Sequence, residues 1–130
     1  NSRRQPWHIA IDVPESGHNP GEEIAAIISM SDGAVATSGN YRNYHNTKEG
    51  AQYGHTISPL TCRPVSTDVI SATVVAPCCI TADAIATTCM AVGADKAMTI
   101  CKSEGLPVML ILRDMRVIMS DDFKKLVVKK

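Results

Sequence analysis

The sequence has no excess of charge of either sign, since 13 lysine and arginine residues balance 13 aspartate and glutamate residues. A nucleic-acid-binding domain normally carries a basic stripe, so this balance argues against nucleic acid as a partner. The sequence also lacks an apolar run long enough to cross a bilayer, and its first residues lack a secretory signal pattern. What remains is a globular domain, and 130 residues are enough for one hydrophobic core.

Several familiar motifs are also absent. The sequence has no Gly-rich phosphate loop, no GxGxxG, no GxSxG and no HExxH pattern. Its cysteines are odd in number and show no zinc-ligand spacing, which argues against a complete disulfide framework and a zinc site. We interpret Cys89 and Cys101 as small apolar residues on helices.

The segments that are present predict an α+β fold, a mostly antiparallel sheet with helices packed on one face. Alternating or β-branched runs indicate strands, and the helices are marked by capping residues and glycines. Strands are expected over 7–13, 34–44, 53–59 and 69–77, a strand pair over 107–120 turning near Arg113 and Asp114, and a last strand within 123–130. Helices are expected from Asn19 through Ile24, Ile27 and Ile28, from Thr81 (as N-cap) to Gly93, and from 94 to Gly105.

The predicted helix after Thr81 carries a carboxylate, Asp83, within an otherwise apolar stretch. Thr87 follows four residues later, so both side chains project from the same side of the helix. A carboxylate and a hydroxyl are hard oxygen ligands that suit magnesium or calcium. The alternative is that Asp83 only favours the helix N-terminus and that Thr87 bonds back to a backbone carbonyl.

Two further groups can contact a ligand. Thr37, Ser38 and Gly39 end a strand of small residues that lets a phosphate or ring approach the backbone. His55 precedes a proline-bearing loop, and a histidine there could contact a ligand or move a proton near neutral pH. The alternatives are a β-bulge with solvent-exposed hydroxyls and a histidine that is structural or merely exposed.

Four segments in order resemble one known family. They are "PWHIAIDVP", "GAVATSGNYRNY", "YGHTISPLTCRPV" and "SATVVAPCCITADAIATTCMAVG". They are similar to the W-x-I-G-I-x-x-P, A-T-S-G-x-Y, H-I-x-D-P-x-T-G-x-P and A-D-A-x-x-T motifs of the ApbE-type FAD:protein FMN transferases. The resemblance implies a T-fold-like architecture, with residues 1–130 as the C-terminal portion of a larger domain whose N-terminal half is absent here.

The resemblance also implies an activity and roles for the candidate residues. It implies Mg²⁺-dependent transfer of FMN from FAD to a threonine or serine hydroxyl of a target flavoprotein, with release of AMP. Asp83 and Thr87 would hold the magnesium ion, Thr37, Ser38 and Gly39 would lie along the flavin nucleotide, and His55 would contact the flavin or deprotonate the acceptor. The alternatives are a metal-dependent FAD pyrophosphatase that yields AMP and FMN, and a flavin-binding or structural module without catalysis.

Further expectations follow from the family alone. Its members are held at the outer face of the bacterial cytoplasmic membrane, or in the periplasm, by an N-terminal lipoprotein anchor, and modify flavoprotein subunits of respiratory or redox complexes. Ser58, Cys62 and Ala10 stand where the motifs have aspartate, glycine and glycine. If the glycine replaced by Cys62 has a positive φ, we expect backbone strain at that position.

Overall fold

The computed structural model describes residues 5–14, 21–40, 44–46, 52–54, 56–58 and 61–129. All strand pairs within these ranges are antiparallel. The elements, in chain order, are β1 (Trp7–Asp12), β2 (Ile24–Met30), β3 (Ala34–Gly39), β4 (Tyr44–Asn46), β5 (Gln52–Gly54), β6 (Val69–Ala76), α1 (Cys79–Val92), α2 (Ala94–Ser103), β7 (Val108–Leu112), β8 (Val117–Met119), α3 (Asp121–Leu126) and β9 (Val127–Lys129). No helix in these ranges is long and apolar enough to span a membrane.

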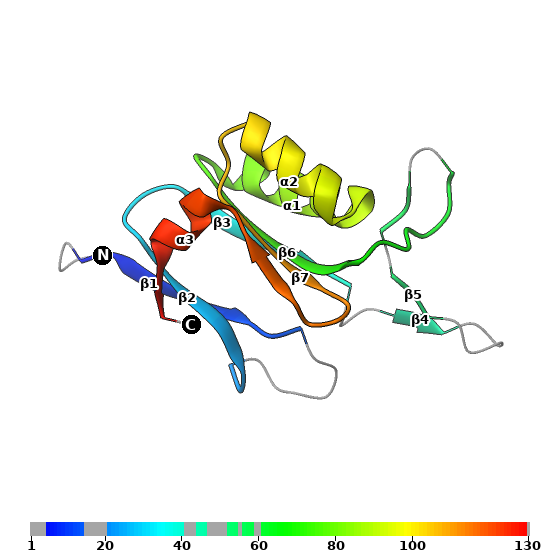
Figure 1. The fold of residues 1–130 in the computed structure, drawn as a ribbon, viewed down its shortest axis with the longest axis horizontal. Helices are drawn as coiled ribbons and strands as arrows, with labels where there is room; N and C mark the ends of the chain where they lie inside the picture. Colours follow the sequence, from blue (N-terminus) through cyan, green and yellow to red (C-terminus); the bar gives the residue numbers. More distant parts are fainter. Residues whose placement is uncertain are drawn as a thin grey trace.

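A four-stranded sheet in the order β3-β6-β7-β8 forms the centre of the molecule (Figure 1). Its two inner strands, β6 and β7, have the sequences VISATVVA and VMLIL, and nearly all of their residues are buried. Strands that are covered on both faces favour such continuous β-branched and aliphatic runs. The sequence therefore predicted these two strands well.

Helices α1 and α2 cover one face of this sheet (Figure 1). Because side chains alternate along a strand, Val108, Leu110 and Leu112 of β7 all point toward the helices. They pack with Ala86 and Ala97, small helical residues that let the helices approach the sheet closely. The predicted α+β fold, with helices on one face of an antiparallel sheet, is confirmed.

The other face of the sheet is covered by a second sheet and a short helix. The second sheet has the order β1-β2-β9. Met109 and Ile111, the alternate residues of β7, pack there against Ile28 of β2 and Phe123 of α3. The site described below lies on the opposite, helix-covered face.

The segment Ile24–Met30 is a strand, so the helix expected to begin at Asn19 is wrong there. Its spacing of isoleucines at 24, 27 and 28 fits a helical stripe, but alternate residues of the segment are buried. These are Ala26, Ile28 and Met30, which follow the period of a strand. Asn19 and Pro20 lie outside the described residues.

Helix α1 begins earlier than predicted, and Thr81 is not its N-cap. Cys78 has an extended backbone and is the N-cap, and its carbonyl accepts the amide of Ala82 at 3.1 Å. Thr81 is therefore inside the first turn, and Asp83 lies beyond that turn. The "SATVVAP" strand ends at Ala76, and the helix begins three residues sooner than a threonine cap at position 81 would require.

The C-terminal expectations were partly wrong. Residues 121–126 form helix α3, capped by Ser120, whose side chain accepts the amide of Phe123. Only Val127–Lys129 form the expected last strand, and this strand pairs with β2. The turn near Arg113 and Asp114 is confirmed, as is the helix closing before Gly105. Strands β4 and β5 form a further hairpin.

Candidate functional site

A cavity of about 650 Å³ lies where α1 packs over β3. It brings together side chains and backbone that are far apart in the sequence. Its lining residues are Thr37, Ser38, Gly39, Thr56, Ile57, Asp83 and Thr87. Five of these seven are residues for which the sequence predicted a ligand or metal contact.

Asp83 and Thr87 lie on the open side of α1. Both are exposed, whereas Ala82 and Ala86, which precede them by one residue, are fully buried against the sheet. The carboxylate of Asp83 makes no hydrogen bond or ion pair with any residue that the structure describes. An aspartate in an apolar helix is thus explained by its position facing the cavity, where burial does not penalise its charge.

The structural alternatives for these two residues are not supported. Asp83 lies outside the first turn of α1, so it is not placed to stabilise the helix N-terminus. The hydroxyl of Thr87 lies 3.0 Å from the Ser38 hydroxyl. It is the next residue, Thr88, that donates back to a carbonyl, that of Ala84, at 2.8 Å.

Strand β3 presents its two hydroxyls on opposite faces of the sheet. Successive residues of a strand point to opposite faces of the sheet. Ser38 points toward α1, where its hydroxyl contacts that of Thr87. Thr37 points the other way, where its hydroxyl lies 2.9 Å from that of buried Thr73. Thr37 therefore borders the cavity as part of β3, while its hydroxyl is engaged on the far side.

Sequence reasoning missed three residues of this region. Thr56 and Ile57 line the cavity, and Thr73 pairs with Thr37 from behind it. The position of Thr73 within the apolar run of β6 indicated a buried hydroxyl that needs a hydrogen-bond partner. That this partner is Thr37 follows only from the register of β3 against β6. His55, the predicted proton acceptor next to Thr56, lies outside the described residues.

The oxygen groups at the cavity fit a magnesium ion that is shared with a ligand. Asp83 is the only carboxylate among the cavity's described lining residues, and it is joined by the hydroxyls of Thr87 and Ser38. The described part of the chain contains no cluster of three or more His, Cys, Asp or Glu side chains suited to a metal. Mg²⁺ is commonly held by one or two protein carboxylates, with phosphate oxygens and water completing its shell. Asp83 and Thr87 suit that kind of site better than a metal enclosed by protein ligands.

The loop that follows Ile57 confirms the expected left-handed position. Cys62 has φ of 54°, a conformation that is costly for residues with a Cβ. Backbone hydrogen bonds hold it there: its amide donates to the Ser58 carbonyl at 2.8 Å, and the Ser58 amide donates to the Arg63 carbonyl at 2.9 Å. This chain thus has a left-handed cysteine at the position where the motif that it resembles has glycine.

We expect Cys62→Gly to stabilise the protein by up to about 1 kcal/mol, since glycine adopts positive φ without a steric cost. Thr61→Gly is the matched control, because Thr61 has no positive φ. That change should destabilise, since glycine adds freedom to the unfolded chain. Urea unfolding measures both, and a loss of stability in Cys62→Gly would contradict the strain at this position.

The chain is similar to known proteins over most of its length. The model of the ApbE family matches residues 1–110. A protein named FAD:protein FMN transferase from Vibrio cholerae is 40% identical over 108 residues, covering 83% of this chain and 31% of the relative. A protein of the same name from Salmonella typhimurium is 35% identical over 131 residues, covering 98% of this chain and 36% of the relative.

Solved structures agree with these sequence matches. The ApbE protein from Thermotoga maritima superposes with a TM-score of 0.78 at 29% identity, over 94% of this chain and 38% of that one. The flavin transferase ApbE from Vibrio cholerae superposes with a TM-score of 0.74 at 35% identity, over 93% of this chain and 38% of that one. The chain thus spans about a third of the length of the curated relatives that it matches.

Proposed function

Because this chain belongs to the ApbE family, we propose that it contributes part of the active site for transfer of FMN from FAD to a threonine or serine hydroxyl of a target flavoprotein. AMP is the leaving group. The observation that carries the proposal is the cavity between β3 and α1, which unites Ser38 and Gly39 with Asp83 and Thr87. The relatives' name, FAD:protein FMN transferase, states transfer of FMN from FAD to a protein for them.

Some residues of the cavity would bind a metal ion, and others orient the side chains that bind it. A magnesium ion on the diphosphate would neutralise the charge that develops as the P–O–P bond breaks. Asp83 would supply the negative charge that holds this ion, and Thr87 would supply a neutral oxygen one helical turn away. Ser38 fixes the orientation of the Thr87 hydroxyl through their hydrogen bond of 3.0 Å. Gly39 leaves room for the nucleotide to approach β3.

The acceptor hydroxyl must lose a proton as its oxygen bonds to the FMN phosphorus. We propose His55 for this role, because it directly precedes Thr56, which lines the cavity. A histidine side chain can take up a proton near neutral pH. The proton leaves the hydroxyl, the new P–O bond forms, and the bond to AMP breaks.

The partners and location of the whole protein are also proposals. We propose that the acceptor is a subunit of a respiratory or redox complex, modified at the outer face of the bacterial cytoplasmic membrane or in the periplasm. We further propose that a membrane anchor, where present, lies outside the residues of this chain. Fractionation of the producing cells, followed by immunodetection, measures this location directly.

The function is tested by incubating the protein that contains this chain with FAD, Mg²⁺ and an acceptor flavoprotein. Flavin that stays on the acceptor through denaturation, together with equimolar AMP, supports transfer. Free FMN and AMP without labelling indicate a pyrophosphatase instead. Bound FAD without any AMP indicates a binding module. An acceptor whose target hydroxyl is removed by substitution with alanine is the matched control.

We expect the 130-residue chain by itself to bind FAD weakly, because Asp83 and Thr87 provide only two of the several oxygen ligands that a magnesium ion needs. FAD is long, and a partial site loses contacts that offset the entropy of fixing it. Fluorescence titration of FAD measures the affinity. A dissociation constant of about 1 μM or lower would contradict the proposal that the site needs more chain than these residues.

A further inference from the structure

Two cysteines from different helices lie in contact beneath the surface of the helix pair. Cys89 of α1 and Cys101 of α2 are both fully buried, and their sulfur atoms are 3.7 Å apart. Both are free thiols in this structure. A disulfide has a sulfur–sulfur distance of about 2.0 Å, so the two sulfur atoms are in contact but must move closer for a bond to form.

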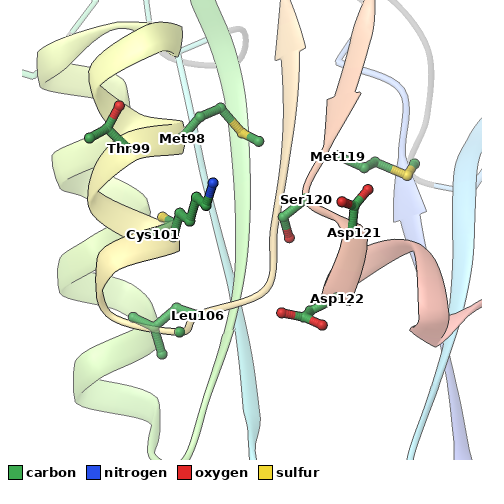
Figure 2. Close-up of a pocket in the computed structure, with 10 residues that line it drawn as sticks. Met98, Thr99, Cys101, Leu106, Met119, Ser120, Asp121 and Asp122 are labelled. Atoms are coloured by element: carbon green, nitrogen blue, oxygen red, sulfur yellow. The ribbon is translucent and has the colours of Figure 1, made fainter.

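One member of this pair borders a cavity. Cys101 belongs to the wall of a hollow of about 420 Å³ between α2 and the segment that joins β8 to α3. Figure 2 shows Met98 and Cys101 on the α2 side of this hollow, with Met119, Ser120 and Asp121 across from them. Cys89 is not among the residues of this wall. Cys101 is therefore the member of the pair nearer to this hollow, although neither side chain is exposed to solvent.

The hydrogen bond between the two sulfur atoms makes their reactivities unequal. It lowers the pKa of Cys101, because a thiol donor stabilises the neighbouring thiolate. The same bond, together with burial, raises the pKa of Cys89. The thiolate is the form that attacks a disulfide, so Cys101 is the expected nucleophile and Cys89 the thiol that resolves the intermediate.

We propose that Cys89 and Cys101 form an intramolecular disulfide when the folded protein meets a small-molecule or protein disulfide as oxidant. The Cys101 sulfur attacks the oxidant's S–S bond, forms a mixed disulfide and releases one thiol. The Cys89 sulfur then attacks Cys101, and the oxidant leaves as its second thiol. Two protons and two electrons leave the cysteine pair, and the oxidant is reduced to two thiols. The new bond ties α1, which carries Asp83 and Thr87, to α2.

Peptide mapping tests the proposal directly. Lys96 lies between the two cysteines, so trypsin separates them unless a disulfide joins their peptides. Replacing Cys62, Cys78 and Cys79 with serine leaves Cys89 and Cys101 as the only cysteines of this chain. After exposure to oxidised glutathione under native conditions, we expect the two tryptic peptides to be joined and the protein to lose two hydrogen atoms. The melting temperature should rise by about 10 °C, because the crosslink closes a short loop in the unfolded chain.

Single replacements test the order of the two steps. Cys89→Ala in the same background should accumulate a stable glutathione adduct on Cys101, since the resolving thiol is absent. Cys101→Ala should leave Cys89 largely unmodified under the same conditions. Circular dichroism verifies that each variant is folded. Joined peptides that appear only after denaturation, or adducts on Cys101 that persist in the two-cysteine protein, would overturn the proposal.

Discussion

Asp83→Ala is expected to lower flavin transfer by at least about 100-fold while leaving the fold intact. The carboxylate is the only full charge at the described part of the cavity, so its loss would remove the main attraction for the proposed magnesium ion. Losing about 3 kcal/mol of such stabilisation gives this factor. Asp83 is exposed and has no partner among the described residues, so unfolding free energy should change by less than about 0.5 kcal/mol. Covalent flavin on the acceptor, measured across a Mg²⁺ titration, reports the effect.

Three further variants sharpen this result. Asp83→Asn keeps the shape but removes the charge, and we expect it to be nearly as impaired as Asp83→Ala. Thr87→Val removes a neutral ligand, so its loss should be smaller, about 10-fold. Asp95→Ala is the matched control, because Asp95 is an exposed aspartate in the first turn of α2, away from the cavity. Unchanged activity in Asp83→Ala would remove the metal assignment.

Phe123→Ala is expected to destabilise the protein by about 3–5 kcal/mol, a large share of a typical domain's stability. Phe123 is fully buried and packs against Ile28 of β2 and Ile111 of β7 in the layer between the two sheets. A helix as short as α3 has little stability of its own, so its position depends on this side chain. Thermal unfolding should show a fall of about 10 °C or more in melting temperature.

Val128→Ala is the control for this prediction, since Val128 lies in the adjoining strand β9 and is 54% exposed. We expect a change of no more than about 0.5 kcal/mol there. Phe123→Leu should recover most of the lost stability, because it retains much of the buried volume. A Phe123→Ala variant that unfolds like the wild type would show that α3 does not connect the sheets.

The fold was predictable where one local signal dominated. The continuous apolar runs of β6 and β7 indicated buried strands, and Gly93 separated the two helices. The segment Ile24–Met30 was ambiguous because isoleucine and alanine at those spacings suit either a helical stripe or an alternating strand. Only its pairing with β1 decides between them, and that pairing is not local information.

The candidate site likewise has features that local spacing predicts and features that depend on non-local packing. That Asp83 and Thr87 share one side of a helix followed from their spacing alone. That Ser38 faces Thr87, while the Thr37 hydroxyl faces Thr73, depends on the register of β3 against β6 and on the packing of α1. The sequence suggested that these segments meet only through their resemblance to a family, and no property of the individual residues contains that information.

The distance along the chain between Ser38 and Thr87 has a consequence for the order of folding. Their hydrogen bond joins residues 49 positions apart, so it can form only after β3, β6 and α1 have assembled. A nascent chain that has emerged only as far as β3 therefore holds no partial version of this cavity. A ligand that contacts both β3 and α1 can bind only after these elements have assembled. It should therefore leave the rate of folding nearly unchanged and slow unfolding instead.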